Sequence, residues 1–65
     1  MEKMEWISVD ENLPRKDDWY LIVLSHLETR ERYIEIDYWE GGDWVSPHYR
    51  EYVLYWMPVP MFPED

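Results

Sequence analysis

The 65-residue sequence lacks cysteine and has only six basic residues against fifteen acidic ones. Without cysteine, the chain forms no disulfide framework and no zinc site that depends on thiolate ligands. With a net charge of −9, it is poorly suited to direct binding of nucleic acid or anionic membranes, because both require cations that neutralise phosphates. Its only two glycines are adjacent, so no glycine-rich loop is available to cradle a phosphate.

Long hydrophobic runs are also missing. The longest uninterrupted apolar run covers residues 19–24, far short of a membrane span. Residues 1–5 show no apolar stretch after a basic start, as a secretory signal would. We therefore expect a soluble, cytoplasmic protein.

The chain is rich in aromatic residues, with five tryptophans and six tyrosines. Residues 1–65 are long enough for one domain, and a chain of this size buries only about 60% of its unfolded surface. Large aromatic side chains are an efficient source of stability under that limit. We expect four tryptophans to form the core: Trp6, Trp19, Trp44 and Trp56. Trp39 is the expected exposed one.

Turn-forming residues divide the chain into short segments rich in β-branched and aromatic residues, which is typical of an all-β domain. Five strands are predicted, over residues 6–9, 19–26, 32–40, 43–45 and 52–57. Gly41 and Gly42 supply the positive φ angles that a tight hairpin needs. Residues 48–51 form a loop or a single short helical turn. Pro58 ends the last strand, because it has no N–H to donate.

These strands predict a small, curved antiparallel sheet, rolled or barrel-like. The second and fifth strands are apolar on both faces and should be central, and the first should pair near the fifth. A chain this short has little material to cover both faces of a sheet. Either the sheet curls on itself, or part of an aromatic face stays exposed as a surface for a homodimer or another partner.

The third strand shows a clear two-residue alternation. Ile34, Ile36 and Tyr38 share one face, and the odd-numbered residues share the other. We predict an exposed acidic-aromatic surface made of Tyr33, Glu35, Asp37, Trp39 and Glu40. Aromatic rings supply contact area and cation–π attraction, and acids steer a basic protein toward it. A solvated strand face with partly covered aromatics is the simpler alternative.

Groups that carry chemistry are few. No serine or threonine lies in a glycine-flanked nucleophile elbow. His26 and His48 are the only neutral-pH bases, and neither has metal-ligand spacing around it. We predict no catalytic residue, no metal site and no cofactor, with both histidines hydrogen-bonded or solvent-exposed. A small hydrolase that pairs one histidine with a carboxylate is a remote alternative.

Two matched stretches stand near the ends of the chain: WISVDENLP at residues 6–14 and YWMPVP at residues 55–60. Together they resemble the bacterial and phage family known as domain of unknown function 551. Its members typically open on W-I-S-V…L-P and close on a T-H-W-M-P-L-P-like stretch, where Tyr55 here replaces a frequent histidine. The signature residues are Trp6, Leu13, Pro14, Trp19, Trp56, Met57, Pro58 and Pro60. The resemblance implies a phage or other mobile-element context and brings no agreed activity.

These observations predict a non-enzymatic interaction module that binds a host or phage protein through the acidic-aromatic surface. The alternative is an acidic inhibitor that mimics nucleic acid and occupies a basic groove, such as that of a defence nuclease. Within the proline-rich residues 57–65, residues 58–60 are predicted to strap back over the domain's own tryptophans. An exposed ligand for an aromatic groove is the alternative, and residues 62–65 form a loose tail.

Overall fold

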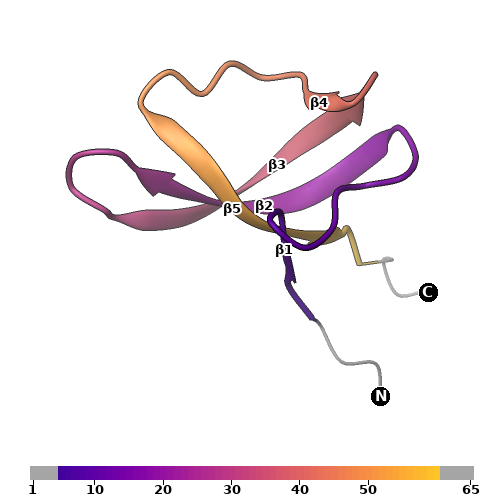
Figure 1. Cartoon of the computed structure of the whole chain (residues 1–65), viewed down its shortest axis with the longest axis horizontal. Coiled ribbons are helices and arrows are strands. Elements are labelled where there is room, and N and C mark those ends of the chain that lie inside the picture. The colour runs from indigo at the N-terminus through magenta and orange to yellow at the C-terminus, as the bar shows by residue number, and fades with distance from the viewer. Residues whose placement is uncertain (1–4, 61–65) are drawn as a thin grey trace, which may run out of the picture.

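The computed structural model describes residues 5–60, which form five antiparallel strands and no helix (Figure 1). The strands are β1 (Ile7–Ser8), β2 (Asp18–His26), β3 (Arg32–Glu40), β4 (Asp43–Trp44) and β5 (Glu51–Pro58). The all-β prediction is confirmed, and each strand lies within one residue of its predicted bounds. Residues 48–50 form no helical turn. This part of the chain has no helix long and apolar enough to cross a membrane.

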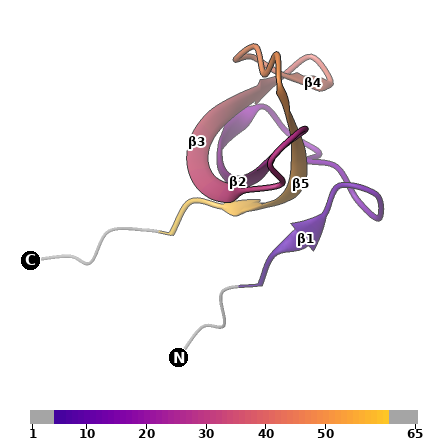
Figure 2. The same cartoon turned by 90° about the vertical axis from the view of Figure 1, so that its left-hand side faces the viewer.

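The strands form one sheet in the order β1-β5-β2-β3-β4, with β2 at its centre. β1 pairs with β5, with Ile7 opposite Trp56, so the two signature stretches lie side by side as predicted. Figure 2 shows the sheet curling, with β3 and β5 on opposite sides of β2. We call the side inside this curl the concave face and the outer side the convex face.

The tight hairpin between β3 and β4 forms as predicted. Gly41 and Gly42 have φ angles of 62° and 90°, and Glu40 pairs with Asp43 across them. Two consecutive positive φ angles are the requirement of a type I′ turn, which glycine meets without strain. The hairpin brings Trp44 opposite Trp39 and so assembles one end of the core.

The core lies on the concave face. It contains Tyr20, Ile22, Leu24, Trp39 and Trp56. Alternate residues of β2 point into it, and Ile22 and Leu24 have no exposed surface. The aromatic rings meet edge to face, with centroids 5.1 Å apart for Tyr20 and Trp56 and 4.7 Å apart for Trp39 and Trp44. This geometry places the positive edge of one ring against the negative face of the next.

The tryptophan predictions are only partly correct. Trp56 is buried and Trp44 packs against the core, as predicted. Trp39, predicted to be exposed, is only 6% exposed, whereas Trp6 and Trp19, predicted to be core residues, are exposed. The reason is strand alternation: Tyr20 points to the concave face, so its neighbour Trp19 points to the convex one.

The signature stretches are joined by side-chain contacts as well as by strand pairing. The indole Nε1–H of Trp56 donates to the carbonyl of Asn12 at 2.9 Å, and Pro14 and Met57 are buried nearby in sequence. β5 ends at Pro58, as predicted. The predicted loose tail at residues 62–65 lies outside the described residues. These contacts give the two signatures a structural role.

Candidate functional site

The predicted acidic-aromatic surface does not form as one exposed patch. Glu35 and Glu40 are exposed and Tyr33 is half-buried, but Asp37 is only 2% exposed and Trp39 is a core residue. That expectation of exposure is therefore wrong for Asp37 and Trp39. The alternation of β3 is as predicted, but its odd-numbered residues face the concave side, where Trp44 and the segment after β4 cover two of them.

Asp37 is the anchor of the segment that follows β4. Its carboxylate accepts hydrogen bonds from the Ser46 hydroxyl at 2.8 Å, the Ser46 N–H at 3.2 Å and His48 Nε2 at 3.1 Å. It also accepts the N–H of Tyr38 at 2.8 Å. A buried carboxylate needs such donors, because taking its charge out of water is otherwise unfavourable. These bonds hold residues 46–48 against β3.

Burial and hydrogen bonding act in opposite directions on the Asp37 carboxyl. Burial is the largest single influence and raises its pKa, but the donors from Ser46, Tyr38 and His48 lower it. Together the donors prevail, and the pKa of Asp37 lies below its usual value. Asp37 is therefore ionised at neutral pH.

The Asp37, Ser46 and His48 side chains differ from a hydrolase triad in their order. In a triad, histidine lies between the carboxylate and the hydroxyl that it deprotonates. Here both Ser46 Oγ and His48 Nε2 bond to the same carboxylate. The hydroxyl proton is thus directed at a buried acid, which makes the cluster an anchor for the loop.

His26 has a similar local role at the other end of the sheet. Its Nδ1 accepts the N–H groups of Glu28 and Thr29 at 3.1 and 3.3 Å and so caps the turn between β2 and β3. Both histidines are hydrogen-bonded, as predicted. Within residues 5–60, no group of three or more histidine and acidic residues is arranged to hold a metal ion.

The convex face carries large apolar side chains that remain exposed. Trp19 is 54%, Ile36 53% and Ile34 60% exposed. Strand pairing makes them neighbours, because Leu21 lies opposite Ile36 and Val23 opposite Ile34. We define this set, Trp19, Leu21, Val23, Ile34 and Ile36, as the convex patch. Sequence reasoning identified the Ile34 and Ile36 face but not its exposure, because period-two alternation does not say which face is covered.

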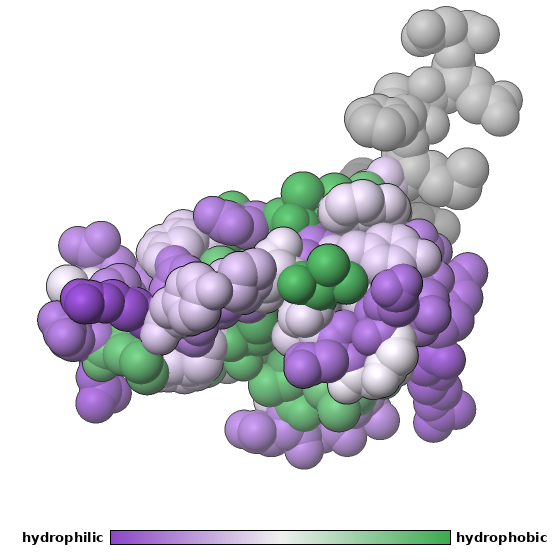
Figure 3. Space-filling model, turned by 90° about the horizontal axis from the view of Figure 1, so that it is seen from above, coloured by the Kyte–Doolittle hydropathy of each residue, from purple (hydrophilic) through white to green (hydrophobic). Residues whose placement is uncertain are grey.

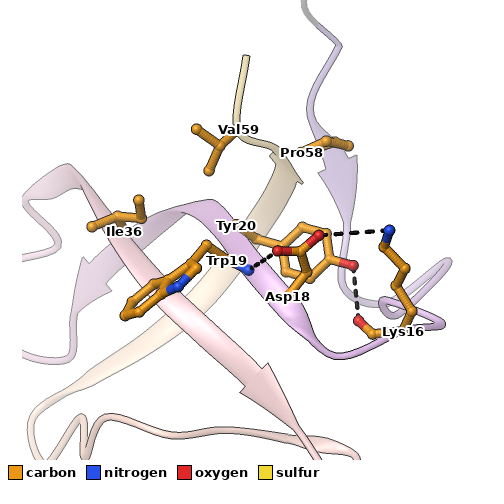
Figure 4. A pocket seen from close by; sticks show the side chains of 7 residues that line it. All are labelled: Lys16, Asp18, Trp19, Tyr20, Ile36, Pro58 and Val59. Carbon is orange, nitrogen blue, oxygen red and sulfur yellow. Dashed lines mark hydrogen bonds and ion pairs between the residues drawn. The ribbon is translucent and has the colours of Figure 1, made fainter. Parts of the chain in front are cut away.

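A groove of about 510 Å³ adjoins the convex patch at the start of β2 and the end of β5 (Figure 4). Its lining includes Trp19, Ile36, Pro58 and Val59. Pro58 and Val59, from the segment predicted to be a strap, line the same groove as Trp19. The rim carries Lys16 and Asp18, whose Nζ and Oδ2 atoms are 3.7 Å apart.

A buried core residue holds the loop that forms the rim of the groove. The Tyr20 hydroxyl donates to the Lys16 carbonyl at 2.9 Å, which ties the loop before β2 to a buried ring. Burial is the main reason that the pKa of Tyr20 is raised, so the hydroxyl keeps its proton and remains a donor. A second hollow, of about 520 Å³, lies between the same loop and β5 and is lined by Ile7, Leu13 and Trp56 among others.

Comparisons with known proteins identify a family but no characterised relative. No curated protein and no solved structure matches the chain. Residues 5–64 match the family described as "Protein of unknown function (DUF551)". This match spans nearly the whole chain and includes both signature stretches. The chain therefore belongs to the DUF551 family of proteins of unknown function.

Proposed function

We propose that this protein is a non-enzymatic interaction module that binds another protein through the convex patch and its adjoining groove. The observation that carries the proposal is the exposure of Trp19, Ile34 and Ile36 on one continuous sheet face. Single exposed apolar residues are normal on protein surfaces, whereas contiguous ones are typical of contact sites. An exposed tryptophan beside a groove is the kind of anchor that dominates binding energy at interfaces.

The charge pattern supports an apolar contact with a polar rim. On β3, Glu35 points to the concave side, so the centre of the convex patch carries no acid. Acids lie at its margins, including Asp18 beside the groove and Glu40 at the hairpin. In the view of Figure 3, hydrophilic residues are spread over much of the surface, and several separate hydrophobic patches lie among them. A partner with an apolar centre and a basic rim fits this arrangement.

The cellular setting is part of the proposal. We place the protein in the bacterial cytoplasm, as an accessory factor of a phage or another mobile element that acts on a host or phage protein. The resemblance of both signature stretches to the bacterial and phage family DUF551 supports this setting.

The test begins with capture of partners from a bacterial lysate on the immobilised chain, followed by purification of each captured protein. Titration calorimetry then measures its affinity for wild type, Trp19→Ser and Tyr49→Ser. Tyr49 is a matched control, because it is 87% exposed in the segment between β4 and β5 and lies outside the convex patch. We expect Trp19→Ser to weaken binding at least about tenfold, the effect of losing a hot-spot side chain, and Tyr49→Ser to change it less than about twofold.

Equal affinities for all three proteins would overturn the proposal. Charge reversal at the exposed acids Glu35 and Glu40 distinguishes this proposal from the alternative of an acidic inhibitor that mimics nucleic acid. Loss of binding in that variant, with full binding by Trp19→Ser, would show that the acids rather than the convex patch make the contact.

A further inference from the structure

The outer edge of β3 is only partly paired. β4 pairs with Trp39 and Glu40 alone, and the Val45 N–H extends that pairing to the Tyr38 carbonyl. The rest of β3, from Arg32 to Ile36, has no neighbouring strand on that side among the described residues. Arg32, Ile34, Glu35 and Ile36 are all exposed. An open strand edge of this kind is a template for pairing with another chain.

The ladder with β2 shows which backbone groups point outward. The His26 N–H donates to the Glu31 carbonyl, so residue 31 bonds toward β2. Bonding direction alternates along an antiparallel strand, so odd-numbered residues of β3 bond to β2 and even-numbered ones point away. The bond from Val45 N–H to the Tyr38 carbonyl agrees with this parity. The N–H and C=O groups of Arg32, Ile34 and Ile36 are therefore the open ones.

Both ends of this free edge are closed. At one end the chain turns through Arg30, which has a φ of 63°. At the other end the Tyr38 N–H is held by the Asp37 carboxylate at 2.8 Å and its carbonyl by Val45. A free edge of residues 32–36 remains, with Ile34 at its middle.

We propose that two copies of this chain pair antiparallel along this edge, with Ile34 opposite Ile34 of the second copy. This register uses every open group, because Arg32 of each copy lies opposite Ile36 of the other and Ile34 lies on the twofold axis. Each of these three residues exchanges both of its backbone bonds with the residue opposite. A second copy fits this edge because its free edge has the same length and because the open groups of Arg32, Ile34 and Ile36 all find partners when two copies pair about Ile34.

Side-chain charge selects the same register. With Ile34 on the axis, Tyr33 of one copy lies opposite Glu35 of the other, and no like charges face each other within residues 32–36. A shift that centres the contact on Glu35 would place two glutamates directly opposite, which is unfavourable. It would also require the groups of Tyr38 that are already bonded to Asp37 and Val45. The pairing joins two sheets into one and makes the two convex patches continuous. This inference does not depend on the proposed function, because it concerns backbone groups at a strand edge rather than the side chains of the convex patch and the groove.

The first test is sedimentation velocity over protein concentrations from about 1 μM to about 1 mM, a range that covers weak association. We expect a reversible monomer–dimer equilibrium. Ile34→Pro removes one outward N–H and leaves the β2 ladder intact, since proline is tolerated on the open side of an edge strand. It should weaken dimerisation at least about tenfold, the effect of breaking one exchanged pair.

Ile34→Thr is the matched control. It keeps the N–H and the β-branched shape but removes the apolar character, so it should change the dissociation constant less than about threefold if the backbone makes the contact. A chain that stays monomeric throughout would overturn the proposal. So would equal weakening by both variants, which would indicate face-to-face packing of the convex patches.

The second test fixes the register and does not depend on the proline variant folding. Because the chain has no cysteine, single-cysteine variants can be joined only at the chosen site. With a short bis-maleimide reagent, Ile34→Cys should cross-link faster than Glu35→Cys, and both faster than Tyr49→Cys at an exposed position away from the edge. Faster cross-linking of Glu35→Cys, or equal rates at all three positions, would contradict the proposed pairing.

Discussion

The two faces of the sheet bury the same residue types to very different extents. On the concave face, Ile22 has no exposed surface and lies under aromatic rings. On the convex face, Ile36 of the neighbouring strand is 53% exposed. A single sheet in a chain of this length buries one face more than the other, because residues 5–60 form no second layer. The concave face supplies the stability, and the convex face is left available for contact.

Truncating the two isoleucines should give the largest contrast. We expect Ile22→Ala to lower the free energy of unfolding by about 3 kcal/mol, because it removes buried methyl groups and leaves a cavity. Ile36→Ala should lower it by less than about 1 kcal/mol, since little buried contact is lost. Urea unfolding followed by circular dichroism measures both. Similar losses in the two variants would mean that the faces do not differ in packing.

Asp37 and Glu35 give a second matched pair, on one strand and one face. Asp37→Ala should lower the free energy of unfolding by about 2–3 kcal/mol, because it removes the acceptor shared by Ser46 and His48 and the bonds that hold residues 46–48 against β3. Glu35→Ala, at an exposed position with no side-chain hydrogen bond or ion pair to residues 5–60, should change it by less than about 0.5 kcal/mol. Chemical denaturation of both variants at neutral pH is the measurement. An unchanged free energy of unfolding in Asp37→Ala would show that Asp37 does not anchor the segment after β4.

Trp56 and Trp19 extend the contrast to the aromatic residues. Trp56→Phe should lower the free energy of unfolding by about 1–2 kcal/mol, because it loses the bond to the Asn12 carbonyl and some buried volume. Trp19→Phe should lower it by less than about 0.5 kcal/mol, since an exposed ring keeps most of its contact with Tyr38. Thermal melts of both variants test this. A larger loss of stability in Trp19→Phe than in Trp56→Phe would contradict this, because it would mean that the convex tryptophan stabilises the fold more than the buried one.

A pH titration should show the smallest effect and assign it to Asp37. The pKa of this carboxyl is lowered by folding, so its contribution to stability is fully present above the unfolded pKa of about 4 and is lost as the pH falls through the folded value. In Asp37→Asn this part of the acid-side loss should disappear. The measurement is the free energy of unfolding of wild type and of Asp37→Asn between neutral pH and pH 3. An equal decrease with falling pH in the two proteins would contradict the assignment.

Strand positions could be predicted from this sequence, because each strand is bounded by turn residues and carries β-branched and aromatic side chains. Gly41 and Gly42 fixed the sharpest turn, since two positive φ angles are needed there. The direction of each face could not be predicted in the same way. Alternation placed Trp39 with Asp37 correctly, but only the pairing of Trp39 with Trp44 shows that this side is the inner one. The Asp37 anchor depends on contacts between residues nine and eleven positions apart, for which the sequence has no local signal.

The most direct test of the account replaces the apolar residues of the groove. Trp19 and Ile36 both line it, and changing both to threonine keeps residues that favour strands while removing the apolar surface. If this surface is kept for binding rather than for folding, the double variant should lose less than about 1 kcal/mol in urea unfolding. A loss of about 3 kcal/mol or more, equal to that of Ile22→Ala, would show that the convex face belongs to the core and would contradict the account.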